Sequence, residues 1–316
     1  MAVSSDIRAW DELIPDTLGL IFTKLSLCER FTVIPRVCKS WASAVNGPYC
    51  WQEIDITDWC SYSEPPQVER MVQMLITRSS GSLRKLSVSG IQTERVFTFI
   101  ADNAGSLQNL RLQRCNINTF AVEQMTGKLS KISILDLSYC LKICSSDIET
   151  IGKNLKHLEV FCRNMHPVET SGKPSEDAEA LAIASTMPKL KRLEMAYNLV
   201  TSEGVYKILS SCPKLEILDL RGCWGVKLDT VSVQQKFPKL AVLGPQVIGY
   251  YEMLEDCSDI SDSSDSEYDD SDMDEYDYDD DSDDGIWYHL GGIEELEFRA
   301  YAGGVEDAAM YWPPSP

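Results

Sequence analysis

The chain has 316 residues, of which 44% are hydrophobic, and a formal net charge of −20. This length suffices for one large domain or two small domains with a proper core. The start, MAVSSDIRAW, has no apolar run of the kind found in signal peptides. No stretch approaches the roughly 18 apolar residues that a membrane helix needs. We therefore expect neither secretion nor a membrane partner.

The negative charge is concentrated in one segment. Residues 255–284 contain 17 Asp or Glu residues and no Lys or Arg, which leaves −3 for the rest of the chain. A nucleic-acid-binding protein needs a cationic face that displaces counterions. The composition therefore argues against a nucleic-acid partner.

Cysteine usage indicates free thiols. The 11 cysteines are odd in number and no secretory signal is evident, a combination typical of a reducing compartment. No C-x-x-C motif occurs, and the 3 histidines are His157, His166 and His289. A structural zinc site is therefore not expected, and we predict neither a metal nor another cofactor.

The first predicted domain, residues 9–50, contains two amphipathic helical stripes. Pro15 suits the first turn of a helix, and Pro35 interrupts the pattern further on. The apolar residues with helical spacing are Leu18, Ile21, Phe22 and Leu25 in the first stripe, and Val37, Trp41 and Val45 in the second. Roughly forty residues make a poor independent core. The module is therefore expected to cover its apolar surface with a partner or with the rest of the chain.

The stretches LIPDTLGLIFTKL at 13–25, VCKSW at 37–41 and WQEI at 51–54 together resemble an F-box, a module of three helices. The resemblance implies docking on a Skp-type adaptor, and through it on a cullin. The positions that carry over as candidate adaptor contacts are Leu13, Pro15, Leu18, Ile21, Phe22, Leu25, Val37, Cys38 and Trp41. The alternative, that some of them and Trp41 above all only hold the helices together, stays open.

A leucine pattern, L-x-x-L-x-L-x-x-C/N, recurs across the second predicted domain, residues 51–254. Copies begin at Leu83, Leu107, Ile132, Leu155, Leu190 and Leu215, with a weak copy at Leu240 and a loose first one at Trp51. The spacings from Leu83 onwards are 24, 25, 23, 35, 25 and 25 residues, which is typical of a leucine-rich-repeat solenoid. We predict an α/β fold with about seven to eight strand–helix units in a right-handed solenoid. The G-H…W-D pattern of a propeller blade, about 40–45 residues long, is absent.

The ninth position of the pattern explains several of the cysteines. Each strand–helix unit can bury its apolar side only against the next unit, and at the ninth position the chain turns inward around a small side chain. Cys115, Cys140 and Cys223 take this position, as does Asn198. Asn can hydrogen-bond the turn, and Cys acts as a small hydrophobe. Because no histidine recurs beside these thiols, we interpret them as packing residues and expect a non-catalytic protein.

The third, fifth and seventh positions of each copy alternate with the buried ones and should face the concave side of the solenoid. This surface is mixed in charge and is our candidate for binding a protein substrate. Its candidate residues are Arg111, Gln113, Asp136, Glu159, Phe161, Arg192, Glu194, Asp219 and Arg221.

Three segments fall outside the repeat pattern. Residues 164–177 fill an interval that is too long and read as a surface loop, either functional or a tolerated insertion. Residues 255–284 are predicted to be disordered, because their like charges repel and they have few apolar residues. Residues 285–316 are apolar enough to dock on the solenoid.

An F-box followed by cysteine-containing repeats resembles plant F-box/leucine-rich-repeat proteins, and stretches such as TMPKLKRLE and WPPSP add to the likeness. The resemblance implies a substrate-recognition subunit of a Skp–cullin–F-box ubiquitin ligase in the nucleus and cytoplasm. The alternative is a chaperone or inhibitor of basic proteins, because repeats with an acidic tail resemble the acidic leucine-rich nuclear phosphoproteins. A hydrolase or transferase is not favoured, because this sequence shows no nucleophile–base arrangement that would support one.

The acidic segment has little reason to fold onto a mixed, slightly acidic concave surface, so we predict an outward electrostatic role. Deleting residues 255–284 should slow substrate association at low salt and change little near 0.5 M, where the screening length is roughly 4 Å. Binding kinetics at two salt concentrations measure this. Tighter substrate binding after the deletion would show that the segment is an inhibitor instead.

Overall fold

The computed structural model describes residue 10 and residues 13–166 and 176–246. The middle of the expected 164–177 loop, the acidic segment 255–284 and the extension 285–316 lie outside the described residues. The described residues belong to two compact units, one with residues 25–39 and the other with residues 13–24 and 40–246. Within these ranges, no helix is both long and apolar enough to cross a membrane.

The N-terminal residues form short helices in place of the three helices that the sequence predicts. These are α1 (Pro15–Phe22), α2 (Leu27–Thr32), α3 (Ile34–Val37), α4 (Lys39–Asn46) and the 3₁₀ turn η2 (Pro48–Trp51). Pro35 cannot donate a backbone hydrogen bond and lies in the first turn of α3, so α2 ends before it. The extended backbone of Cys38, with φ −160° and ψ 169°, then separates α3 from α4.

Aromatic side chains form the core of the part of this module that holds α1, α4 and η2. Leu18 and Phe22 of α1 are buried, and the ring of Phe22 lies 5.1 Å from that of Trp41. The indole of Trp51 is fully buried and donates a hydrogen bond of 2.7 Å to the carbonyl of Val45. This bond satisfies the polar atom of a large buried ring.

The repeats form one parallel sheet of eight strands, in which spatial order follows chain order. The strands are β1 (Glu53–Asp55), β2 (Lys85–Ser89), β3 (Asn109–Gln113), β4 (Ile134–Asp136), β5 (Val160–Cys162), β6 (Arg192–Glu194), β7 (Ile217–Asp219) and β8 (Ala241–Leu243). Sequential parallel neighbours are the arrangement that a stack of strand–helix units produces. The sheet confirms a solenoid of leucine-rich repeats rather than a propeller.

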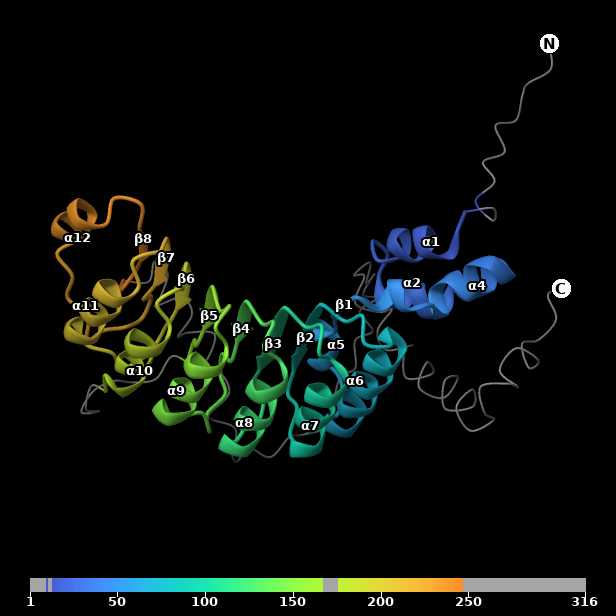
Figure 1. Cartoon of the computed structure of the whole chain (residues 1–316), viewed down its shortest axis with the longest axis horizontal. Helices are drawn as coiled ribbons and strands as arrows, with labels where there is room; N and C mark the ends of the chain where they lie inside the picture. The colour runs from blue at the N-terminus through green and yellow to red at the C-terminus, as the bar shows by residue number, and fades with distance from the viewer. Residues whose placement is uncertain (1–9, 11–12, 167–175, 247–316) are drawn as a thin grey trace, which may run out of the picture. The chain divides into compact units, whose positions relative to one another are not determined.

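Helices connect successive strands and lie along one side of the sheet, as Figure 1 shows for α6 to α11. They are α5 (Thr57–Cys60), α6 (Pro65–Ser79), α7 (Glu94–Asn103), α8 (Thr119–Lys128), α9 (Ser145–Asn154), α10 (Ala178–Thr186), α11 (Ser202–Ser211) and α12 (Thr230–Lys236). Leu86, Leu110 and Leu135 pair in register on neighbouring strands and are all buried. The alternate side chains, such as the paired Ser87 and Arg111, therefore face the open side of the sheet.

The turn after several strands requires a left-handed backbone at the eighth repeat position. Glycine supplies it at Gly90 (φ 78°) and at Gly222 (φ 73°), where a Cβ would clash with the ring of Tyr197. Arg114, Tyr139 and Tyr197 adopt the same conformation, with φ of 52°, 63° and 60°. A residue other than glycine in the left-handed conformation costs about 1–2 kcal/mol. Arg114, Tyr139 and Tyr197 therefore occupy positions where the backbone conformation favours glycine.

The fifth repeat is shifted by three residues from the register that the sequence pattern predicts. Phe161 pairs with Leu135 and Leu193 and is fully buried, so it takes the fourth, core-facing position. Leu158 is then the first position, and Arg163 takes the sixth position, where neighbouring repeats have leucine or methionine. The prediction that Phe161 faces the concave side is therefore wrong.

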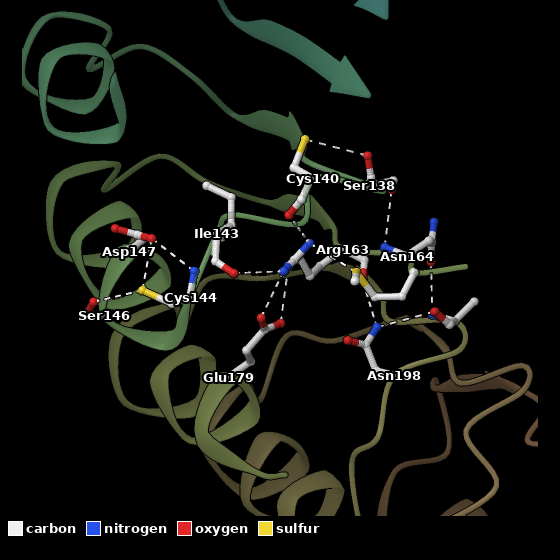
Figure 2. A network of polar contacts seen from close by, with 12 residues as sticks. Ser138, Cys140, Ile143, Cys144, Ser146, Asp147, Arg163, Asn164, Glu179 and Asn198 are labelled. Atoms are coloured by element: carbon white, nitrogen blue, oxygen red, sulfur yellow. Dashed lines mark hydrogen bonds and ion pairs between the residues drawn. The ribbon is translucent and has the colours of Figure 1, made fainter. Parts of the chain in front are cut away.

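The buried Arg163 is compensated by a network of hydrogen bonds (Figure 2). Its side chain is 3% exposed, and its Nε and Nη2 donate to the two carboxylate oxygens of Glu179 at 3.2 and 3.0 Å. Nη1 donates to the carbonyl of Cys140 at 3.0 Å, and Nη2 to that of Ile143 at 3.1 Å. One guanidinium thus fastens the preceding turn to the first turn of α10, across the 164–177 segment.

Removing one partner of the Arg163–Glu179 ion pair should destabilise the solenoid, because the other partner is then a buried charge without compensation. Glu179→Gln is expected to lower the free energy of unfolding by about 3 kcal/mol, and adding Arg163→Met should restore part of that loss. Urea unfolding of the single and the double variant, compared with the unaltered protein, measures both effects. The control is Lys153→Gln, which breaks the exposed pair with Glu149 and should change little. Equal losses in Glu179→Gln and the control would contradict the assignment.

Candidate functional site

Helix α1 divides its apolar side chains between the core and the solvent. Leu18 and Phe22 turn inward and are 0% and 2% exposed, whereas Leu20 and Ile21 are 52% and 39% exposed. Ile14, which directly precedes the helix, is 64% exposed. Several large apolar residues in water within one short segment indicate a surface that a partner covers.

The unit of residues 25–39 shows the same division. A capping box begins α2, in which the Glu29 backbone N–H donates to Ser26 Oγ at 3.2 Å and the Ser26 N–H donates to Glu29 Oε2 at 2.9 Å. These bonds from the backbone and hydroxyl of Ser26 lower the pKa of Glu29. Ile34 is buried, while Val33 and Val37 are about half exposed, at 52% and 51%. This unit too presents apolar side chains to the solvent.

The candidate adaptor contacts therefore separate into three groups. Ile21, Val37 and Pro15 are exposed, whereas Leu18, Phe22 and the half-buried Trp41 serve the core of the module. Leu13, Leu25 and Cys38 are half-buried. Sequence reasoning missed Ile14, Leu20 and Val33, which lie outside the amphipathic stripes. The signal that could have identified these exposed residues is a large apolar side chain that lies outside the amphipathic stripe.

On the open face of the sheet, the fifth repeat positions form a row across β3 to β7. Strand pairing places Arg111 next to Asp136, Asp136 next to Cys162, Cys162 next to Glu194, and Glu194 next to Asp219. Glu159 precedes β5 and pairs with Lys191 on the neighbouring strand connection at 2.8 Å, rather than lying in this row. The row is thus acidic over most of its length.

Each carboxylate in the row already has hydrogen-bond donors. Asp136 accepts from the Gln113 Nε2 at 2.7 Å and from the Ser138 backbone N–H at 2.9 Å. Glu194 accepts from Arg192 Nε at 2.7 Å and from Asn164 Nδ2 at 3.1 Å. These donors offset the cost of partly burying a negative charge.

Asp219 holds Arg221 through two guanidinium nitrogens, Nη2 at 2.6 Å and Nε at 3.0 Å. This hydrogen bonding raises the pKa of Arg221 above its ordinary value. Arg221 and Arg192 remain 56% and 45% exposed, whereas Asp219 is 3% exposed. The acids therefore orient the arginines, and the arginines are what a partner on this face would meet.

The cysteine at the fifth position of β5 is unsuited to nucleophilic chemistry. Cys162 is 8% exposed. Burial raises the pKa of Cys162, and the carboxylates of Asp136 and Glu194 raise it further. The thiol therefore stays protonated at neutral pH.

Cys140, Cys223 and Asn198 share one structural role at the ninth position, whereas Cys115 is buried as predicted but donates to the carbonyl of Gln113 in its own repeat at 3.2 Å. Cys140 Sγ donates to the carbonyl of Leu112 at 3.0 Å, and Cys223 Sγ to that of Met195 at 3.0 Å, in each case in the preceding repeat. Asn198 donates to the carbonyl of Arg163 in the same way at 2.7 Å. Burial raises the pKa of Cys140 to about 11 and that of Cys223 to about 12. These thiols link neighbouring repeats.

Comparison with known proteins agrees with both parts of the structure. A model described as "F-box domain" matches residues 10–53, and a "Leucine Rich repeat" model matches residues 186–209. The F-box protein FBW2 of Arabidopsis thaliana is 49% identical over 100% of both chains. Putative F-box/LRR-repeat protein 22 and F-box protein SKIP19 of the same plant are 32% and 31% identical, each over 69% of this chain and 71% of their own.

The fold and its two surfaces define an F-box protein with a leucine-rich-repeat solenoid. At this level of identity over the whole chain, the protein belongs to the plant F-box/leucine-rich-repeat family.

Alkylation kinetics should separate structural thiols from accessible ones. At pH 8 a thiol with a pKa of 11, as for Cys140, is ionised in only about one molecule in a thousand. Iodoacetamide should therefore label the exposed Cys144 at least about tenfold faster than Cys140 or Cys223, as followed by peptide mass spectrometry. Equal labelling rates in the folded protein would contradict the packing role.

The same thiols give the stability a dependence on alkaline pH. In the unfolded chain they ionise near pH 8.5, whereas the folded Cys140 ionises only near 11. The free energy of unfolding should therefore fall as the pH rises above about 9.

Proposed function

We propose that this protein is the substrate-recognition subunit of a Skp–cullin–F-box ubiquitin ligase and directs a bound protein to ubiquitination and proteasomal degradation. The observation that carries the proposal is the set of exposed apolar side chains, Ile14, Leu20 and Ile21, in a segment that matches the F-box. The family membership supports it, since the relatives are named as F-box proteins.

Docking on a Skp-type adaptor gives these side chains a partner. Fully burying one large aliphatic side chain contributes about 1.5–3 kcal/mol, and a few central apolar residues usually dominate an interface. In the unit of residues 25–39, Val33 and Val37 are exposed apolar side chains as well. A cullin would then be reached through the adaptor.

The solenoid supplies the second binding function. Its concave face presents Arg111, Gln113, Arg192, Glu194 and Arg221 to a protein substrate. The buried Asp136 and Asp219 act behind this surface by holding the side chains beside them. The role of the receptor is proximity, because it raises the effective concentration of substrate lysines near a ubiquitin-charged enzyme. No group of this chain takes part in the transfer itself, and the complex would act in the nucleus and cytoplasm.

The alternative, a chaperone or inhibitor of basic proteins, would use an acidic surface. The carboxylates of Asp136, Glu194 and Asp219 are already engaged by donors of this chain. Binding a basic partner there would first require breaking these bonds. The concave face therefore favours the receptor over the chaperone.

Charged residues at the exposed apolar positions Ile21 and Val37 should weaken adaptor binding without unfolding the protein. Ile21→Asp together with Val37→Asp is expected to weaken binding of a plant Skp-type adaptor at least about tenfold, which corresponds to about 1.4 kcal/mol. Calorimetric titration and the melting temperature are the measurements. The control is Leu141→Asp, at a side chain 72% exposed on the solenoid, which should leave the affinity unchanged.

Leu18→Ala is a poor test of docking, since deleting a fully buried side chain costs about 2–5 kcal/mol of stability. If the Ile21→Asp/Val37→Asp variant bound the adaptor as tightly as the unaltered protein, the docking assignment would be wrong.

A further inference from the structure

The turns that follow β3 and β4 carry side chains that the fold does not require. Gly90 and Gly222 show that glycine fits the left-handed eighth position of a repeat, yet Arg114 and Tyr139 adopt it with φ of 52° and 63°. Glycine is the residue that this backbone conformation favours. Residues held in an unfavourable conformation often mark a functional site.

Arg114 and Tyr139 build a column with His166 from the next repeat. The Arg114 guanidinium lies 5.4 Å from the centre of the Tyr139 ring, and that ring lies 4.5 Å from the His166 ring at an interplanar angle of 39°. Main-chain bonds set this order: Arg114 N–H donates to Ser138 O at 3.0 Å, and Tyr139 N–H donates to Asn164 O at 2.8 Å. The column thus runs across three repeats at the ends of their strands.

The three turns that bear this column carry cationic and apolar side chains. The segments 113–117, 138–142 and 164–166 contain Arg114 and Lys142 and no Asp or Glu. Both side chains are exposed, and among the described residues neither forms an ion pair. Leu141, between the column and Lys142 in the chain, is 72% exposed. We call Arg114, Tyr139, Leu141, Lys142 and His166 the edge surface.

The edge surface is held in place from behind. The Arg163 guanidinium donates to the carbonyls of Cys140 and Ile143 at 3.0 and 3.1 Å (Figure 2), the residues on either side of Leu141 and Lys142 in the chain. Glu179 fixes this guanidinium in turn at 3.0 Å. The turn is therefore fixed before any partner arrives, which reduces the entropy lost on binding.

We propose that the edge surface binds an acidic segment of a protein substrate that carries a leucine or aromatic side chain among its carboxylates. Arg114 and Lys142 would pair with the carboxylates, while Leu141 and the Tyr139 ring would contact the apolar side chain. Charge complementarity favours this occupant, because the edge surface has cations without acids. The concave arginines Arg192 and Arg221 differ, since each is already paired with an acid.

That the bound segment belongs to a ubiquitination substrate rests on the proposed function. The binding itself does not, and can be tested with peptides. The full chain, bound to its Skp-type adaptor, would be used to select from a phage-displayed library of random dodecapeptides. Acidic sequences containing Leu, Phe or Tyr should be enriched, and the leading synthetic peptide would then be titrated by fluorescence anisotropy.

The matched variants exchange the same number of charges at two places. Arg114→Glu/Lys142→Glu should weaken peptide binding at least tenfold, whereas Lys153→Glu/Lys207→Glu, on exposed positions of α9 and α11, should change it less than twofold. If the first variant melts early, Arg114→Gln/Lys142→Gln should show a smaller loss in the same direction. Raising the salt concentration should also weaken binding.

Several outcomes would overturn the proposal: no enrichment, enrichment of neutral or basic peptides, or equal effects of the two charge-reversal variants. Enrichment seen only after deletion of residues 255–284 would also overturn it, because the occupant would then be the acidic segment of this chain. The Ile21→Asp/Val37→Asp variant tests adaptor binding, and peptide selection can also be run on the chain without the adaptor. The two measurements are therefore independent. Failure of the edge surface and failure of the ligase role are thereby distinguished.

Discussion

Parallel hydrogen bonding between the strands of neighbouring repeats is the constraint on which the rest of the structure depends. Each strand gives its apolar side chains to the core only if it lies in register with both neighbours, as Leu86, Leu110 and Leu135 do. A shift of one residue would turn the buried side chains outward. The same register decides which residues face the concave side and which lie at the strand ends.

The fifth repeat shows how strong this constraint is. Here Arg163 takes a core position that leucine or methionine fills elsewhere, and the register is kept by Phe161, which pairs with Leu135 and Leu193. The guanidinium is tolerated because Glu179 and two carbonyls satisfy it. An arginine can bond to several carbonyls at once, which leucine cannot. Arg163, the charged residue in the core, therefore fixes the turn that bears Leu141 and Lys142 of the edge surface.

The sequence predicts the repeats well, because their apolar pattern recurs at nearly constant spacing and the physical reason for it is the same in every copy. The shared role of Cys140, Cys223 and Asn198 follows from that period alone. The register of the fifth repeat does not, since Leu155 and Leu158 allow two alignments and a charged residue occupies a core position. Only the pairing of Phe161 with its neighbours resolves them.

The binding surfaces were less predictable for a related reason. An amphipathic stripe on α1 identifies apolar residues, but it does not separate Leu18 and Phe22, which face the core, from Ile21, which faces solvent. The edge surface depends on left-handed residues, and Arg114 and Tyr139 are not types whose presence predicts that backbone. Non-local contacts decide both cases.

Two binding functions in separate parts of the chain are the central claim, and amide hydrogen exchange with and without the Skp-type adaptor tests it most directly. Exchange reports local opening residue by residue. The account predicts that the adaptor slows exchange between residues 13 and 46 and leaves residues 111–116 and 138–142 unchanged. Protection by the adaptor along the ends of β3 and β4, with residues 13–46 unaffected, would contradict it.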